Sequence, residues 1–258
     1  MLYLIYLSLL LILWRTSLWQ PRELPDVKRE APLLLGHRGV RGLRPENTLA
    51  AVSYALEAGL DGVEVDLQRL ADGAIVLFHD DETSGVNLKN ISLETFRELE
   101  PQAPTLDKLF GLVKRYPNTL LNLELKTQGW STNGLERATI RALHASKIAG
   151  RTLISSFNPL SLLRVRLFAP KVRVGLLYAP DLPSWLRSGW LAAWLHVDAL
   201  HPFESLVDAK LMRRAQRRGL MVNTWTVNDQ KRITSLQALQ VTAIIGDDPA
   251  RLLAHKAG

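Results

Sequence analysis

The sequence predicts a closed α/β barrel of the TIM type, with a small β-hairpin inserted after the second strand and a hydrophobic helix at the N-terminus. Three observations predict it. The chain has 258 residues, and about 250 residues is the usual size of a barrel of eight strands and eight helices. Eight short apolar runs alternate with amphipathic stretches, as parallel strands do with their helical crossovers. One further strand-like run breaks the alternation and predicts the hairpin.

The first element is a hydrophobic segment over residues 1–19. It carries no charge from Met1 to Trp14, and Arg15 is its single charge. A helix of 19 residues would reach about 28 Å, close to the thickness of the hydrocarbon core of a bilayer. Aromatic residues, Trp19 among them, lie toward its two ends, where amphipathic rings prefer the membrane interface. We therefore expect residues 1–19 to attach the protein to a membrane.

Two alternatives remain for this segment, a cleaved signal peptide and a helix that lies flat on the membrane. A signal peptide is disfavoured because no Lys or Arg precedes the apolar run and no small-x-small cleavage site follows it. The flat helix stays open because an uncharged run of 14 residues is short for a span. Basic residues follow the segment and none precedes it, so the positive-inside rule favours placing the large domain on the cytoplasmic face.

Residues 20–32 are rich in proline and charge and are expected to form a linker, and the barrel is expected over residues 33–258. We predict strands at 33–37, 62–68, 119–126, 152–157, 172–178, 197–202, 220–227 and 241–246. Helices are predicted between most of them, at 48–58, 105–116, 133–146, 160–168, 206–218 and 229–239.

The hairpin follows the second predicted strand. Asp72-Gly73 separates that strand from a short apolar run at 74–79, and Asp-Gly between apolar runs favours a tight turn. Parallel strands need a crossover of a dozen or more residues, so this pair is antiparallel. Such pairing places His79 opposite Asp66, within one residue of register.

Composition excludes several classes of protein and site. The chain has no cysteine, which rules out disulfide scaffolds, thiolate metal sites and cysteine nucleophiles. The formal net charge is +7, which favours anionic partners. One predicted helix holds much of it, in Lys210, Arg213, Arg214, Arg217 and Arg218. We interpret this helix as a solvated outer helix, with attraction to anionic phospholipid as the alternative; nucleic acid is not expected, because aromatics do not interleave these arginines.

Carboxylates gather at the ends of two predicted strands. Glu64 and Asp66 are two residues apart and share one face of a strand, as do Glu124 and Lys126. Buried carboxylates need a cation or hydrogen-bonding partners, and an oxygen-rich set of three suits Mg²⁺ or Ca²⁺. The alternative is that each acid forms a buried salt bridge with a nearby Arg or Lys.

Histidines stand at corresponding places. His37 and Arg38 end the first predicted strand, and His79 ends the hairpin. Two histidines facing one substrate can divide general-base and general-acid work. Arg38 and Lys126 supply donors suited to a phosphate. In a barrel, all of these strand ends meet on the carboxyl face.

These residues belong to motifs that occur in a fixed order along residues 33–253. The motifs are Leu35-Gly36-His37-Arg38-Gly39, Pro45-Glu46-Asn47-Thr48, Glu64-Val65-Asp66, His79-Asp80, Glu124-Leu125-Lys126 and Trp225-Thr226-Val227-Asn228. With them the chain resembles the glycerophosphodiester phosphodiesterase family. The resemblance implies a barrel that uses one divalent cation to cleave glycerophosphodiesters into glycerol 3-phosphate and an alcohol.

The resemblance also implies roles for individual residues. Glu64, Asp66 and Glu124 would hold the metal, and His37 and His79 would be the catalytic pair. Arg38 and Lys126 would contact the phosphate, Glu46 and Asn47 would brace the site or the glycerol, and Trp225 would form a wall of the pocket. Phe157 ends another strand and is expected to border the pocket. The expected substrate-binding residues are thus Arg38, Glu46, Asn47, Lys126, Phe157 and Trp225.

Several alternatives stay open at this level. The nucleophile is either water or the substrate's own glycerol hydroxyl, and either histidine can be the acid. The apolar N-terminus also suits a lysophospholipase D-like activity on lysophospholipids. A noncatalytic membrane-bound receptor for phosphodiesters is a third hypothesis, although a pure binder has little need for two histidines beside a cation.

Overall fold

The computed structural model describes residues 3, 5–10, 19–22, 32–187 and 191–254. Its parallel strands are β1 (Leu33–Gly36), β2 (Gly62–Arg69), β6 (Leu120–Leu125), β7 (Thr152–Ser156), β8 (Arg173–Tyr178), β9 (Ala199–Pro202), β10 (Met221–Thr224) and β11 (Ala243–Gly246). They pair in the order β1-β11-β10-β9-β8-β7-β6-β2, and β1 also pairs with β2. The sheet therefore closes on itself, and all eight predicted strands are confirmed.

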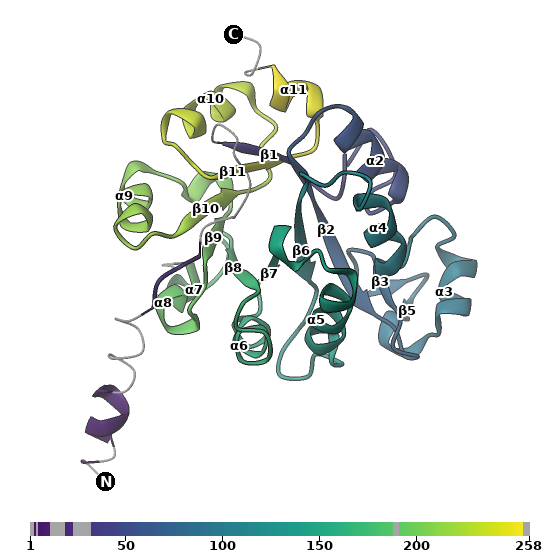
Figure 1. Ribbon diagram of the computed structural model, residues 1–258, viewed down its shortest axis with the longest axis horizontal. Coiled ribbons are helices and arrows are strands. Elements are labelled where there is room, and N and C mark those ends of the chain that lie inside the picture. Colours follow the sequence, from purple (N-terminus) through teal and green to yellow (C-terminus); the bar gives the residue numbers. More distant parts are fainter. Residues whose placement is uncertain (1–2, 4, 11–18, 23–31, 188–190, 255–258) are drawn as a thin grey trace.

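Helices lie outside this ring (Figure 1). The six predicted ones are confirmed with shifted ends: α2 (Leu49–Glu57), α4 (Leu106–Val113), α5 (Leu135–Ser146), α6 (Pro159–Phe168), α9 (Ala209–Arg217) and α10 (Gln230–Ala238). Several of them begin at a side chain that accepts a backbone N–H, as Thr48, Asn158, Asp208 and Asp229 do, which satisfies donors that have no partner inside the helix. Among the described residues, four short helices were not predicted: α3 (Leu93–Leu99), α7 (Ser184–Arg187), α8 (Leu191–Leu195) and α11 (Pro249–Leu253).

Alternate residues of each strand face the helices and the barrel interior. On β2, Val63, Val65 and Leu67 belong to the large apolar core shared with the helices, while the intervening Glu64 and Asp66 are buried carboxylates. Leu33, Leu35, Leu120, Ala243 and Ile245 form a second apolar cluster, contributed by strands alone. The period of two along each strand thus separates packing against the helices from the residues inside the barrel.

The inserted hairpin has the predicted pairing. Strand β3 (Ile75–Leu77) is antiparallel to β2, with Leu67 opposite Leu77. The N–H of Phe78 donates to the carbonyl of Asp66, so His79 lies within one residue of Asp66, as expected. Gly73 turns the chain with φ of +92°, a conformation that favours glycine.

The insertion continues further than the sequence predicted. After β3 come β4 (Glu82–Thr83), β5 (Val86–Asn87) and α3 (Leu93–Leu99). They cover the outer side of the hairpin with an apolar cluster of their own, which consists of Leu70, Val76, Leu88, Ile91 and Phe96. The added segment therefore supports the strand that carries His79.

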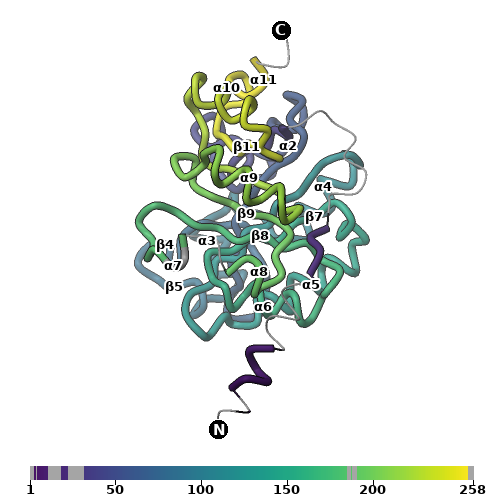
Figure 2. The backbone as a smooth tube through the Cα atoms, turned by 90° about the vertical axis from the view of Figure 1, so that its left-hand side faces the viewer, coloured from purple at the N-terminus to yellow at the C-terminus, as the bar shows by residue number. Residues whose placement is uncertain are grey.

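The N-terminal segment is described in part. Residues 5–10 are helical, their large apolar side chains are exposed, and this turn stands clear of the barrel in both views (Figures 1 and 2). Among the described residues, no helix has the length and apolar character needed to cross a membrane. Residues 11–18 of the expected membrane segment, and 23–31 of the expected linker, lie outside the described residues.

Trp19, expected near a membrane interface, packs against the barrel. Its ring stacks on His196 with 4.7 Å between centroids, and its Nε1 donates to the carbonyl oxygen of Val197 at 3.2 Å. Burial of a large ring against the barrel, with its N–H satisfied, is favourable. The sequence did not predict these partners on the folded domain, and the place of Trp19 relative to a membrane stays a prediction.

Asp198 organises the end of the barrel where Trp19 packs. Its carboxylate is fully buried, accepts the Arg166 guanidinium at 2.6 Å and the Val174 N–H at 2.9 Å, and also accepts the Arg22 N–H at 2.9 Å. Removing one partner of a buried ion pair leaves the other charge without compensation.

We predict that Asp198→Asn lowers the free energy of unfolding by about 3 kcal/mol, because the Arg166 guanidinium then faces a neutral amide. Urea denaturation measures this. The control is Asp208→Asn, which keeps an acceptor at the exposed start of α9 and should change stability by less than about 0.5 kcal/mol. Equal stability of the two variants would show that the ion pair contributes nothing.

Candidate active site

Three carboxylates meet where β2 and β6 end. Asp66 and Glu124 are partners in the parallel register of these strands, and Glu64 lies two residues earlier on the same face of β2. Oxygen atoms from all three lie within 4.8 Å of one another. The structure thus brings together the three residues that the sequence suggested as metal ligands.

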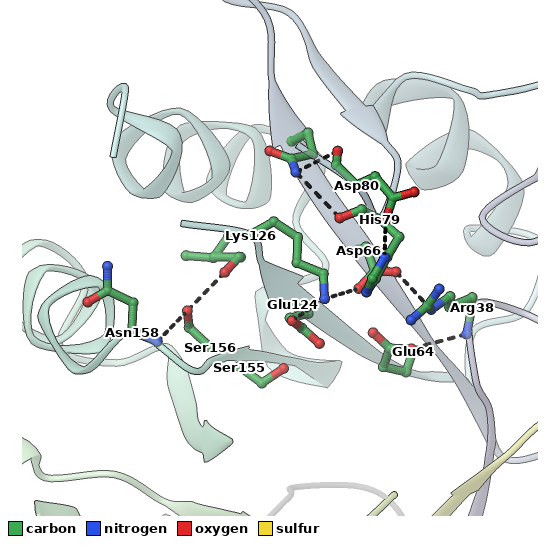
Figure 3. Close-up of polar contacts among 12 residues, drawn as sticks. Arg38, Glu64, Asp66, His79, Asp80, Glu124, Lys126, Ser155, Ser156 and Asn158 are labelled. Carbon is green, nitrogen blue, oxygen red and sulfur yellow. Dashed lines mark hydrogen bonds and ion pairs between the residues drawn. The ribbon is translucent and has the colours of Figure 1, made fainter. Parts of the chain in front are cut away.

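Two basic side chains contact this cluster, from opposite sides in the view of Figure 3. Lys126 Nζ lies 2.5 Å from Glu124 Oε1 and 3.1 Å from Asp66 Oδ1. Arg38 Nε lies 3.2 Å from Asp66 Oδ2, and the backbone N–H of Arg38 donates to Glu64 Oε2 at 3.0 Å. The salt-bridge alternative from the sequence is therefore realised for Asp66 and Glu124, whereas Glu64 accepts a backbone N–H instead.

Positive charge is distributed unequally over the three acids. Burial, together with repulsion from Asp66 and Glu124, raises the pKa of Glu64 well above its usual range. Burial also raises the pKa of Glu124, to about 7, although Lys126 opposes this rise. For Asp66, the attraction of Lys126 and Arg38 outweighs burial and lowers the pKa. The positive charge of Lys126 and Arg38 is therefore not enough to stabilise all three acids in their ionised form.

The donor set fits a hard divalent cation. Glu64 Oε1 is buried and accepts no hydrogen bond from the residues that the structure describes, and a buried acceptor without a partner is costly. Three carboxylates are the ligands that Mg²⁺ and Ca²⁺ prefer. A cation bound among them would satisfy Glu64 and offset the repulsion within the cluster.

The loop after β1 positions Arg38 and Asp66. Arg38 and Asn47 both have positive φ, +50° and +56°. Asn47 Nδ2 donates to Asp66 Oδ2 at 2.8 Å, and its Oδ1 accepts the Asp66 N–H at 3.0 Å. Glu46 accepts a hydrogen bond from Arg38 at 2.7 Å. Asn47 thus orients Asp66, and Glu46 orients the Arg38 guanidinium.

His37 is held by residues from the other end of the chain. Its Nδ1 lies 2.7 Å from Asp247 Oδ1. Asp247 in turn accepts from Asn228 Nδ2 at 2.5 Å, and its N–H donates to Asn228 Oδ1 at 2.9 Å. Burial alone would raise the pKa of Asp247, but the hydrogen bonds from His37 and Asn228 outweigh burial and lower it. Asp247 is therefore an anion that fixes the orientation of the His37 ring.

His79 has an equivalent partner. Its Nδ1 lies 2.6 Å from Asp80 Oδ1, and the pair is more exposed than His37 and Asp247. With Nδ1 engaged by a carboxylate, each histidine keeps its Nε2 available for proton transfer. The two rings are thus prepared in the same way.

Both histidines line one cavity of about 200 Å³, together with Arg38, Glu64, Glu124, Lys126, Phe157 and Trp225. Trp225 packs edge to face against Phe157 and Phe203, with 5.5 Å and 5.4 Å between ring centroids. A second cavity of about 360 Å³ shares His79, Glu124, Lys126 and Phe157 with the first. The cavity therefore has an ionic wall from the acids and their cations, and an aromatic wall from Phe157 and Trp225.

The chain resembles known enzymes in both sequence and fold. Residues 37–251 match the Glycerophosphoryl diester phosphodiesterase family. A glycerophosphodiester phosphodiesterase from Caldanaerobacter subterraneus subsp. tengcongensis is 32% identical over 237 residues, 86% of this chain and 96% of the relative. The chain belongs to the glycerophosphoryl diester phosphodiesterase family. As a member of that family it is an enzyme, a phosphoric diester hydrolase.

Solved structures agree with this assignment. A putative glycerophosphoryl diester phosphodiesterase from Silicibacter pomeroyi superposes with a TM-score of 0.81 at 23% identity, covering 90% of this chain and 95% of that chain. An Oleispira antarctica phosphodiesterase, solved in complex with the product sn-glycerol-3-phosphate, has a TM-score of 0.74 at 27% identity and covers 88% of this chain and 97% of that chain. The first comparison supports the barrel fold.

Three residues of this phosphodiesterase site were given no role from the sequence: Asp247, Asn228 and Phe203. Asp247 follows β11 and Asn228 follows β10, and both lie at strand ends on the carboxyl face, a signal that could have indicated them. Phe203 follows β9 in the same way. His201 of β9 is fully buried; burial lowers its pKa to about 3, and its Nε2 accepts from Asn223 at 3.0 Å.

We predict that Asp247→Asn lowers kcat for diester hydrolysis about ten- to hundredfold while KM changes little. The neutral amide cannot orient the His37 ring as the Asp247 carboxylate anion does. Steady-state kinetics on glycerophosphocholine measure this split. Asp248→Asn is the control, since the neighbouring Asp248 caps α11 and pairs with Arg251 but does not line the cavity. An unchanged kcat in Asp247→Asn would remove Asp247 from the site.

Proposed function

We propose that the protein hydrolyses glycerophosphodiesters to glycerol 3-phosphate and an alcohol, using one divalent cation, Mg²⁺ or Ca²⁺, and two-histidine acid/base catalysis. One observation carries the proposal: two members of the carboxylate cluster, Glu64 and Glu124, and two carboxylate-oriented histidines line the same cavity. The product named for the Oleispira antarctica relative, sn-glycerol-3-phosphate, supports the same reaction.

Glu64, Asp66 and Glu124 are the proposed metal ligands. A divalent cation bound here would polarise the phosphoryl oxygens as a Lewis acid. Its positive charge would offset the negative charge that develops on them during the reaction. Asp66 is already oriented by Asn47, and Glu64 by the N–H of Arg38. The ligands therefore need little rearrangement to bind a cation.

His37 and His79 are the proposed general acid and base. One Nε2 removes a proton from the nucleophile, and the other gives a proton to the departing alkoxide. The Nδ1 contacts with Asp247 and Asp80 hold both rings in place for this exchange. The nucleophile is water or the glycerol hydroxyl of the substrate.

Arg38 and Lys126 are the proposed phosphate contacts. The Arg38 guanidinium is held by Glu46 and Asp66, and the attraction of Glu124 and Asp66 outweighs burial and raises the pKa of Lys126. Both side chains are therefore cations in the site, where they favour a phosphate diester. Phe157 and Trp225 offer an apolar wall for the carbon skeleton of the substrate, and the adjoining cavity offers room for the alcohol.

We also propose that residues 1–19 anchor the enzyme to a membrane with the catalytic domain on the cytoplasmic face. The uncharged run from Met1 to Trp14 and the basic residues that follow it support this proposal. Residues 5–10 also leave their large apolar side chains exposed.

We predict that the full chain releases glycerol 3-phosphate from glycerophosphocholine when Mg²⁺ or Ca²⁺ is present and stops when a chelator is added. His37→Ala should lower kcat/KM about 10²- to 10⁴-fold, because proton transfer is lost. Glu64→Gln should raise the cation concentration needed for half-maximal rate, because a charged ligand is lost. The product is measured with a coupled glycerol 3-phosphate assay.

His144→Ala is the control for both variants, because His144 lies at the exposed end of α5, on the outside of the barrel. Turnover that persists in folded His37→Ala would contradict the two-histidine mechanism. Full activity in the presence of the chelator would contradict the role of the cation.

We further predict that the full chain sediments with membranes after a high-salt wash and is released by detergent. A chain that begins at Trp19 should appear in the supernatant, because it lacks the apolar run. Immunoblotting of the fractions measures this. Recovery of the full chain in the high-salt supernatant without detergent would contradict the anchor.

A further inference from the structure

The chain between the apolar segment and the barrel is fastened to the barrel. Besides the contacts of Trp19 with His196 and Val197, the guanidinium of Arg166 lies 4.5 Å from the centroid of the Trp19 ring. The N–H of Arg22 donates to the buried Asp198 at 2.9 Å. Residues 19–22 are therefore held by stacking, cation–π and hydrogen-bond contacts together.

These contacts identify one face of the barrel. His196, Val197 and Asp198 immediately precede β9, so they lie where the strands begin. The carboxylates and histidines of the site lie where the strands end. Trp19 is thus attached to the amino-terminal face, opposite the catalytic cavity.

Little chain separates this attachment from the apolar run. Four residues lie between Trp14 and Trp19, so the gap spans at most about 17 Å when fully extended. Strand β6 alone, with six residues, spans about 20 Å from one face of the barrel to the other. The connection is too short to pass around the barrel and bring the cavity to the level of the apolar segment.

The amino-terminal face also carries the charge that an anionic membrane attracts. The loops that join each helix to the next strand are all described, and their acidic residues, Asp61 and Asp198, are both buried. Each accepts backbone N–H groups, Asp61 from Leu34 and Asp198 from Val174. The exposed charges of these loops are basic: Lys114, Arg115, Lys147, Lys171 and Arg218.

We infer that the amino-terminal face of the barrel lies against an anionic lipid bilayer, so that the catalytic cavity opens away from it and takes water-soluble glycerophosphodiesters. This inference rests on the proposed function and the proposed anchor. A lysophospholipid in the same bilayer keeps its phosphate at the headgroup level, on the far side of the barrel from the cavity. The geometry thus disfavours the lysophospholipase D-like alternative.

The orientation is tested with site-specific probes, which the chain permits because it has no cysteine. Lys171→Cys places a fluorophore on the amino-terminal face, and Lys231→Cys places one in the first turn of α10, at the opposite face. The labelled full chain is bound to vesicles of phosphatidylcholine and phosphatidylglycerol that contain a lipid with a headgroup quencher. We expect quenching at position 171 and little at position 231.

Two pairs of charge reversals test the surface itself. Lys114→Glu with Lys171→Glu should weaken vesicle binding at least about thirtyfold, since each basic residue near an anionic surface contributes roughly a factor of five. Lys210→Glu with Lys231→Glu changes the net charge equally, at helix starts near the catalytic face, and should change binding far less. Equal quenching at positions 171 and 231, equal loss in the two pairs, or no vesicle binding would each overturn the inference.

Substrate turnover separates this inference from the proposed function. Unlabelled full chain on the same vesicles should hydrolyse dissolved glycerophosphocholine and leave lysophosphatidylcholine in those vesicles intact. Turnover of the vesicle-embedded lysophosphatidylcholine would overturn the inference. Failure to hydrolyse glycerophosphocholine without vesicles would reject the proposed function, while the quenching and charge-reversal results would still decide the orientation.

Discussion

Repulsion among three buried carboxylates is the constraint around which the site is arranged. Parallel pairing of β2 with β6 forces Asp66 and Glu124 together, and Glu64 joins them from the same face. Burial of these carboxylates in a low-dielectric environment strengthens the repulsion among them. Lys126 and Arg38 relieve it only in part, and mainly at Asp66. The carboxylate cluster therefore still needs further positive charge. Around it lie the loop after β1, the hairpin with His79 and the aromatic wall.

The sequence was sufficient for the barrel and for the residues at the strand ends. Strands with a period of two and crossovers with amphipathic helices leave few arrangements other than a closed ring. Once the ring is accepted, the ends of its strands converge, so Glu64, Asp66 and Glu124 had to be neighbours. The Asp-Gly turn placed His79 correctly because a tight turn fixes the register of the strands it joins.

Contacts between distant segments were not predictable in this way. Asp247 reaches His37 because β11 closes the ring beside β1, and nothing local to either residue encodes that meeting. The stacking of Trp19 on His196 was missed for the same reason, since an indole suits a membrane interface and a protein surface equally well. Residues 82–99 hold strands of only two residues and one short helix, which are too short to show a clear hydrophobic period.

The distance along the chain between His37 and Asp247 has a consequence for biosynthesis. The two residues are 210 positions apart, so the ribosome exposes the first strand long before the last one exists. Contacts of such high sequence separation form late. His37 therefore acquires its orienting anion only when β11 has docked. Nascent and C-terminally truncated chains therefore lack the carboxylate that orients His37, so the phosphodiesterase site is complete only after β11 has closed the barrel.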